Sequence, residues 1–310
     1  MSAPRRYRAS SGPRFLESAS LGYLDRGRSA VVLVRPTPGA RTPVELGVRC
    51  VVPTLLTGLW RADDGSVFVA DRDGFVRWSA DPWDDARWQQ QELDLVFHGV
   101  QGASSRHVWA WGQRPMDGAS LVRRYDGRSW KAVGAPGFGI AAIAVGDQVW
   151  CAGEGGQLAR FDGSGWTVLA LADGVDLVAL HAPPARSDLE GARPLRHPYE
   201  TGAHGVVVAA ADGRVLHVQV DASAERVRVV GQVPVRPFAV AVWRGAVWVG
   251  AGEQGLWQLT DGAARCVRDD RLCRSLDARD ELVIGCDDVI SGSPDGARFP
   301  ATGRGFLDGA

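Results

Sequence analysis

The stretch that decides the fold is "VWCAGEGGQLARFDGSGW", residues 149–166. It opens with a short apolar run, breaks at Gly-Glu-Gly-Gly, resumes, breaks again at Asp-Gly and ends on a tryptophan. Short runs rich in β-branched and aromatic residues and bounded by glycine are typical of β-strands. Asp-Gly suits a tight hairpin, because both residues tolerate positive φ. The stretch therefore predicts two strands, two turns and the start of a third strand.

The opening run of this stretch recurs along the chain. Equivalent runs begin at Val67, Val108, Val149, Val206, Val247 and Leu282, which gives offsets of 41, 41, 57, 41 and 35 residues. We attribute the offset of 57 to an insertion at about residues 186–205. A turn and another apolar run precede each opening run, and two more runs follow it. Four short strands repeated about every 40 residues are the signature of a β-propeller blade.

A repeated aspartate supports this blade pattern, because one follows every opening run at a similar distance. These aspartates are Asp81, Asp126, Asp162, Asp221, Asp261 and Asp295, and four of them precede glycine. We expect them in the hairpin between the third and fourth strands of each blade. An aromatic residue then opens the fourth strand in three repeats, at Trp130, Trp166 and Phe299.

The repeats delimit one all-β domain. Six blades are predicted, at residues 54–95, 96–137, 138–175, 176–232, 233–270 and 271–305. In the less regular N-terminal region, residues 18–34 resemble the first two strands of a blade and "TPVELGV" (42–48) a third strand. We predict a single propeller over residues 14–310 with seven four-stranded blades, the N-terminal one degenerate, after a flexible tail at 1–13. Six blades are the alternative.

These residues also carry a family resemblance. "VWAWGQ…LVRRYDGRSWKAV" and "VWCAGEGGQLARFDGSGWTVL" resemble the VWAxG…DGxxW repeats of bacterial β-propeller proteins, within the WD40-like and Asp-box-like propeller superfamily. The resemblance covers most of residues 54–300. It implies a propeller fold and implies function only weakly. Because the full Asp-box spacing of sialidases is missing, their enzymatic roles are not carried over.

Composition narrows the function classes. The chain has 35 Lys and Arg against 36 Asp and Glu, so no global charge favours nucleic acid or an anionic membrane. "PRRYR" (4–8) is a lone basic cluster, and no run of about 18 apolar residues predicts a membrane span. The five cysteines are odd in number and form no CxxC pair. We therefore expect reduced thiols in a cytoplasmic protein, with no cofactor.

The first candidate site is a ring of polar residues just after the second strand of each blade. These residues are Asp71, Gln113, Glu154, Asp212, Glu253 and Asp287. The loops between second and third strands share a face of a propeller with the loops that link blades. If all six lie at one register, they form a negative mouth that binds a cation or a basic protein surface. The alternative is that they only stabilise turns.

The second candidate is the insertion, because long loops on a rigid scaffold often carry recognition. Arg193, Arg196 and Tyr199 are residue types enriched at binding hot spots. His197, Glu200 and His204 are weak metal candidates, since their spacing matches no zinc motif.

Two groups of three stand out among the twelve tryptophans. Trp109, Trp150 and Trp248 share one strand position, so we expect them to pack between blades. Trp78, Trp83 and Trp88 are clustered in "WSADPWDDARW". They either pack on fourth strands or, if exposed, stack on sugars or contact a protein.

No catalytic motif is present, so the main prediction is a non-catalytic protein-interaction scaffold that binds another protein through one propeller face. An immunity protein or a subunit of a larger complex is a variant of this class. The first alternative is a glycan-acting hydrolase or lyase with paired carboxylates in the mouth. The second is a carbohydrate-binding module that uses exposed tryptophans.

Overall fold

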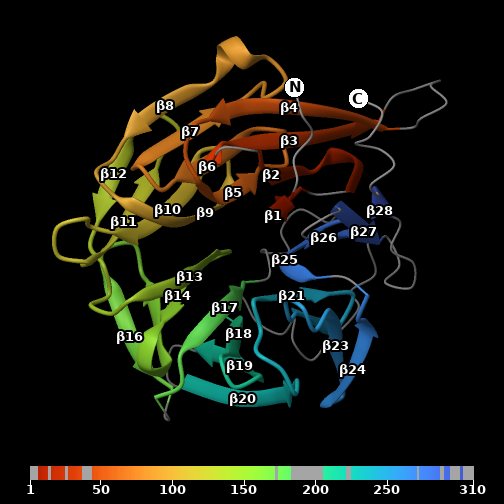
Figure 1. Cartoon of the computed structure of the whole chain (residues 1–310). Coiled ribbons are helices and arrows are strands. Elements are labelled where there is room, and N and C mark those ends of the chain that lie inside the picture. The colour runs from red at the N-terminus through yellow and green to blue at the C-terminus, as the bar shows by residue number, and fades with distance from the viewer. Residues whose placement is uncertain are drawn as a thin grey trace, which may run out of the picture. The chain divides into compact units, whose positions relative to one another are not determined.

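The computed structural model describes residues 6–12, 15–24, 27–36, 44–171, 174–182, 205–220, 225–270, 272–286, 290–293 and 301–302. In these residues the chain forms seven four-stranded sheets, each of which pairs its strands in chain order (Figure 1). The helical elements described there are the short 3-10 turns η1 (Phe15–Glu17), η3 (Asp85–Arg87) and η4 (Glu154–Gly156). No helix in the described ranges is long and apolar enough to span a membrane. The fold is a seven-bladed β-propeller.

The chain divides into two compact units, and the first unit holds four sheets. Sheet 1 contains β1 (Arg6–Ser11), β2 (Ala19–Tyr23), β3 (Ser29–Pro36) and β4 (Val44–Val52). Sheet 2 contains β5 (Leu56–Arg61), β6 (Val67–Asp71), β7 (Phe75–Ser79) and β8 (Gln89–Glu92). Sheet 3 contains β9 (Val96–Ser104), β10 (His107–Gln113), β11 (Ser120–Tyr125) and β12 (Trp130–Val133). Sheet 7 contains β25 (Cys273–Ala278), β26 (Leu282–Cys286), β27 (Ile290–Ser293) and β28 (Ala301–Thr302).

The second unit holds the remaining three sheets. Sheet 4 contains β13 (Ile140–Val145), β14 (Val149–Gly153), β15 (Gln157–Phe161) and β16 (Trp166–Ala170). Sheet 5 contains β17 (Leu177–His181), β18 (Gly205–Ala210), β19 (Arg214–Val220) and β20 (Glu225–Gln232). Sheet 6 contains β21 (Ala239–Trp243), β22 (Ala246–Gly250), β23 (Leu256–Thr260) and β24 (Ala263–Arg268).

The second strands form the most buried layer of the structure. β6, β14, β22 and β26 are buried along their whole length. Trp109, Trp150 and Trp248 are at most 2% exposed, and the prediction of packing between blades is confirmed for Trp150. In the second unit, Trp150 packs with Leu158 and Val208 in a core cluster between sheets 4 and 5.

The aspartate register also lies where the sequence predicts it. Asp81, Asp126, Asp162 and Asp261 fall between the third and fourth strands of their sheets, while Asp221 and Asp295 lie outside the described residues. Asp162 Oδ1 accepts hydrogen bonds from the backbone N–H groups of Ser164 and Gly165. Asp261 and Gly262 both have positive φ (51° and 83°), which matches the two-residue hairpin that Asp-Gly favours.

The N-terminal sheet differs from the prediction by one strand. Residues 6–11 form β1, where we expected a tail over 1–13. Residues 18–34 therefore supply the second and third strands of sheet 1, and "TPVELGV" enters the fourth. The polar sequence RYRASS of β1 has no apolar pattern that would predict a strand. Instead, pairing with β2 and contacts with sheet 7 hold β1 in place. Sheet 1 is thus a complete four-stranded blade.

Candidate functional site

Each sheet has an end at which the chain enters the first strand from a linker. The loop between the second and third strands lies at this same end, which we call the linker end. Backbone hydrogen bonds connect this loop to the linker in four sheets. They join Arg72 N to Leu55 O (3.0 Å), Glu154 N to Gly139 O (3.0 Å), Ala211 N to Asp176 O (2.8 Å) and Phe238 N to Gly250 O (2.8 Å). In these sheets the candidate loops and the linkers therefore lie at the same end.

In sheet 2 the predicted site residue Asp71 is part of the protein interior. It is the last residue of β6 and is fully buried. Its Oδ1 accepts hydrogen bonds from the N–H groups of Asp73 (3.0 Å) and Phe75 (2.9 Å), and its Oδ2 pairs with the guanidinium of Arg77. Its oxygens are already engaged within the sheet, so Asp71 does not belong to an exposed ring.

In sheet 3 the predicted site residue Gln113 is half-buried at the end of β10. The loop beyond it is exposed and is closed by an ion pair between Arg114 and Asp117 (2.8 Å). The side chain of Met116 in this loop is 93% exposed. Met116 is thus the most exposed large apolar side chain among the described residues, and no motif in the sequence marks it.

In sheets 4, 5 and 6 the predicted residues are exposed carboxylates at the linker end. Glu154 begins η4, and its carboxylate lies over Gly139, where an added Cβ would be 2.4 Å from Glu154 Cδ. Asp212 lies two residues beyond β18 and accepts hydrogen bonds from Arg214 N (3.1 Å) and Nε (2.6 Å). Glu253 lies three residues beyond β22 and is exposed.

The prediction that the candidates share one register is therefore wrong for the five that the structure describes. Asp71 and Gln113 end their strands, whereas Glu154, Asp212 and Glu253 lie one, two and three residues beyond theirs. The first two are buried or half-buried, and the other three are exposed. Asp287 lies outside the described residues.

The linker end of sheet 6 also carries an exposed aromatic side chain. Phe238, in the linker that enters the sheet, is 45% exposed. Its ring lies over Gly252, where an added Cβ would approach Cε2 to 2.8 Å. Glu253 follows Gly252 directly, so an apolar surface and a carboxylate lie next to each other at this end.

The insertion is attached at the opposite end of its sheet. Arg193, Arg196, Tyr199, His197, Glu200 and His204 all lie outside the described residues. The segment joins β17, which ends at His181, to β18, which begins at Gly205. Asp212 follows the other end of β18, so the mouth and the insertion start from opposite ends of sheet 5. In the part of the chain that the structure describes, no group of three His, Cys, Asp or Glu could hold a metal ion.

The tryptophan cluster packs against other parts of the first unit. Trp78 packs on Tyr125 and Trp130, with ring centroids 5.5 and 6.5 Å apart. The Trp83 ring lies against Gly47 and beneath the guanidinium of Arg35 (4.1 Å). Trp88 is half-buried, and its Nε1 donates to the backbone of the same loop. These contacts occupy the rings and give the sugar-stacking alternative no support.

The structure contains a polar network that sequence reasoning missed, at the end of β1, β5 and β25 away from the linker end. Ser10 N donates to Ser275 Oγ (2.9 Å), while Ser11 Oγ and Gly12 N donate to Asp277 Oδ2 (2.7 and 3.0 Å). Each bond joins residues about 265 positions apart. The network fastens the first strand of the N-terminal sheet to the first strand of the C-terminal sheet.

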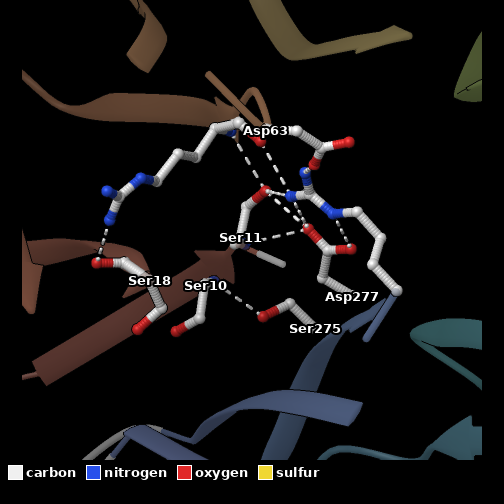
Figure 2. Close-up of polar contacts among 9 residues, drawn as sticks. Ser10, Ser11, Ser18, Asp63, Ser275 and Asp277 are labelled. Atoms are coloured by element: carbon white, nitrogen blue, oxygen red, sulfur yellow. Dashed lines mark hydrogen bonds and ion pairs between the residues drawn. The ribbon is translucent and has the colours of Figure 1, made fainter. Parts of the chain in front are cut away.

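Arg279 is the centre of this network. Its guanidinium donates to Ser11, Asp63 and Asp277, whose side chains are labelled in Figure 2, and to the carbonyl of Arg61 (2.7 Å). Burial raises the pKa of Asp277, but the charge of Arg279 and three hydrogen-bond donors outweigh burial and leave the pKa below its usual value. The network thus holds a charged pair inside the seam between sheets 7, 1 and 2.

Comparison with known proteins identifies the fold. No family model and no curated protein matches the sequence. Among solved structures, the WD40 β-propeller domain of Doa1 matches with a TM-score of 0.65 at 9% identity, over 92% of this chain and 91% of that one. The fold is a WD40-like β-propeller. Saccharomyces cerevisiae Sqt1 (TM-score 0.64, 11% identity, 97% and 86% coverage) and the Myceliophteria thermophila Cps50 (Swd1) β-propeller domain (0.62, 13%, 92% and 94%) are similar to the same extent.

Proposed function

We propose that this WD40-like propeller is a non-catalytic protein-binding scaffold, and that the linker end of sheets 4, 5 and 6 is a contact surface for its partner. The observation that carries the proposal is the exposure of Glu154, Asp212 and Glu253 in three consecutive sheets. Turn stabilisation alone does not require exposed carboxylates in each loop, since Asp71 stabilises its turn while buried.

The chemistry of this end selects a partner with basic and apolar groups. Exposed carboxylates attract Lys and Arg side chains and steer the encounter. Phe238, 45% exposed beside Glu253, supplies an aromatic surface of the kind that anchors interfaces. Asp287, Arg193, Arg196 and Tyr199 remain predicted contacts of the same scaffold. All five cysteines are free, which fits the cytoplasm as the compartment of this interaction.

The enzyme alternative receives less support from the same residues. A glycan-cleaving pair needs two carboxylates about 5–10 Å apart that are free to act on substrate. Asp71 is buried against Arg77, and Asp212 pairs with Arg214. A protein-binding surface requires only exposed charged side chains, whereas a catalytic pair requires two carboxylates held at a fixed distance.

A matched pair of charge reversals tests the proposal. Glu154→Lys changes the linker end of sheet 4, and Asp147→Lys changes an exposed acid in the turn at the opposite end of the same sheet. We expect tagged wild-type protein and Asp147→Lys to recover the same partner from the native host, and Glu154→Lys combined with Glu253→Lys to lose it. Equal recovery by all variants, or turnover of a glycan panel by the purified protein, would contradict the proposal.

A further inference from the structure

The first unit holds a cavity of about 470 Å³ between sheets 2 and 3. Its volume lies within the range of sites that bind small molecules, about 300–1,000 Å³. Sheet 2 contributes the end of β8 and the linker that follows it, and sheet 3 contributes β11 and β12. The lining residues, none of which is a candidate site residue, are Glu92, Leu93, Asp94, Arg123, Trp130 and Ala132.

The apolar part of the cavity wall is anchored in the hydrophobic core. Leu93 and Trp130 are 9% and 8% exposed and belong to the core cluster between sheets 2 and 3. Leu93 N donates to Gly74 O (2.9 Å), which ties the linker to the loop between β6 and β7. The Trp130 ring packs on Tyr125, with ring centroids 5.2 Å apart. This part of the wall is therefore fixed, and it suits an aliphatic chain.

Arg123 gives the cavity a positive charge. It lies on β11, two residues from both Leu121 and Tyr125, which pack in the same core cluster. Because side chains alternate along a strand, Arg123 points to the face of β11 that packs on sheet 2. It is half-buried, and its guanidinium forms no hydrogen bond or ion pair with any residue that the structure describes. A carboxylate bound in the cavity would supply the partner that this guanidinium lacks.

Two carboxylates give the cavity negative charge. Glu92 ends β8, Asp94 lies two residues further along the linker, and both are exposed. Within the described ranges neither carboxylate accepts a hydrogen bond or forms an ion pair, so neither neutralises Arg123. One basic and two acidic side chains thus line one cavity without pairing with each other.

These three charges select a ligand with the opposite pattern. A simple carboxylate is repelled by the two acids, and a diamine is repelled by the arginine. A neutral amino acid has only one cation for the two acids. One carboxylate and two cations, carried on a short aliphatic chain, match all three charges and the apolar wall. This is the chemistry of a free basic amino acid.

We propose that this cavity binds a free basic amino acid of the lysine or arginine type. The ligand carboxylate pairs with Arg123, while its α-ammonium and side-chain cation pair with Glu92 and Asp94. Its methylene groups contact Leu93 and Trp130. A lysine within a peptide chain fits less well, because it has neither the free α-ammonium nor the carboxylate.

Isothermal titration calorimetry of the full chain tests the charge pattern. The probes are lysine, arginine and three analogues of lysine that each lack one charge: cadaverine without the carboxylate, norleucine without the side-chain cation and Nα-acetyl-lysine without the α-ammonium. We expect lysine or arginine to bind, and each analogue to bind at least about tenfold more weakly, because each loses one charge-assisted contact. Hydrogen exchange at residues 92–95 should slow when lysine binds.

Variants assign each charge to its partner. Arg123→Met should weaken lysine at least about tenfold, and Arg123→Glu should reverse the preference so that cadaverine binds more tightly than lysine. Glu92→Gln with Asp94→Asn should remove the advantage of lysine over norleucine. Asn suits position 94, since Asp94 has a φ of 51°, which Asn also tolerates. Arg128→Met is the matched control, because Arg128 is an exposed arginine in the turn between β11 and β12.

Four outcomes would overturn this inference. They are the absence of saturable binding of lysine and arginine, equal affinities for lysine and norleucine, unchanged lysine affinity in Arg123→Met, and an equal loss of affinity in Arg128→Met. Circular dichroism checks that the variants are folded. Glu154→Lys separates this site from the linker end, since it should remove the scaffold partner and leave lysine binding unchanged. A peptide with an internal lysine that binds as tightly as free lysine would assign the cavity to a protein segment instead.

Discussion

Asp71 and Glu154 occupy the same connection in two different sheets, and the structure uses them in opposite ways. Asp71, in the first unit, is buried, holds its turn through two backbone N–H groups and neutralises Arg77. Glu154, in the second unit, is exposed and forms no hydrogen bond or ion pair through its carboxylate with the described residues. The difference is a matter of one position: Asp71 is the last residue of β6, and Glu154 is the first residue after β14.

The comparison teaches that a repeated residue type at a blade end has no fixed role. A carboxylate inside the strand lies between neighbouring sheets, where burial is tolerated only with a cation and hydrogen-bond donors. A carboxylate beyond the strand lies in water, where it costs little and is available to a partner.

The largest expected effect comes from Asp71. We expect Asp71→Ala to lower the free energy of unfolding by about 3–5 kcal/mol, because it leaves the Arg77 guanidinium without its buried partner. Glu154→Ala should change the free energy by less than about 0.5 kcal/mol, as is usual for surface substitutions. Urea denaturation of the three proteins, followed by circular dichroism, measures both values. Similar losses of stability in the two variants would contradict a structural role for Asp71 that Glu154 lacks.

A second substitution shows whether the unpaired charge is the cause. Asp71→Ala combined with Arg77→Met removes both charges, so the double variant should be more stable than Asp71→Ala alone. If the double variant is less stable by the sum of the single effects, the turn hydrogen bonds of Asp71 matter more than its ion pair.

The seam between sheets 7 and 1 should respond less strongly. Asp277→Ala removes the carboxylate that binds Ser11, Gly12 and Arg279, yet Arg279 keeps its ion pair with Asp63. The Asp277 side chain is also 17% exposed, so water reaches the site. We expect a loss of about 2–3 kcal/mol in urea denaturation, toward the lower end for a broken buried pair. Ser275→Ala, which removes one neutral hydrogen bond from Ser10, should cost about 1 kcal/mol and serves as the reference.

Acid should abolish the contribution of Asp277. Its pKa in the folded chain is lowered, chiefly because the attraction of Arg279 and the hydrogen bonds outweigh the opposing effect of burial. A lowered folded pKa stabilises the protein above the unfolded pKa of about 3.9, and this stability is lost as pH falls through the folded value. The difference in unfolding free energy between wild type and Asp277→Asn should therefore be constant from pH 7 to about 5 and shrink below about pH 4. A difference that instead grows in acid would reverse the assigned direction.

Much of the fold could be predicted because short sequence patterns determine its strands and hairpins. The opening runs mark the second strands, and Asp162 and Asp261 mark hairpins through their own turn chemistry. β1 could not be predicted in this way, since its polar sequence pairs with β2 and bonds to residues about 265 positions away. Long-range polar contacts of this kind leave no periodic trace in the sequence.

The candidate site was predictable only in outline. The sequence located the polar residues in the right loops, but a shift of one to three residues past a strand end separates an exposed Glu253 from a buried Asp71. Phe238 and Met116 were missed because single apolar residues in loops carry no pattern. Their exposure depends on what the surrounding sheets leave uncovered, which only the packed structure reveals.

The smallest expected effect uses Cys50 as a reporter of the charges around Asp71. Burial raises the pKa of the Cys50 thiol to about 12; the charge of Arg77 lowers it, and those of Asp85 and Asp71 raise it further. Asp71→Asn removes one raising charge and leaves Arg77 unopposed, so the thiolate fraction should increase. We expect alkylation of Cys50 at pH 9 to become about two- to threefold faster.

The labelling experiment contains its own references. The exposed Cys266 measures reagent activity, and the buried Cys151 reports any opening of the fold. Glu154→Gln should leave the Cys50 rate unchanged, because Glu154 is not among the charges that act on this thiol. Faster labelling of Cys50 and Cys151 together would indicate loosened packing. Faster labelling of Cys50 alone would show that the buried carboxylate acts through its charge, which is the property that Glu154 directs toward solvent.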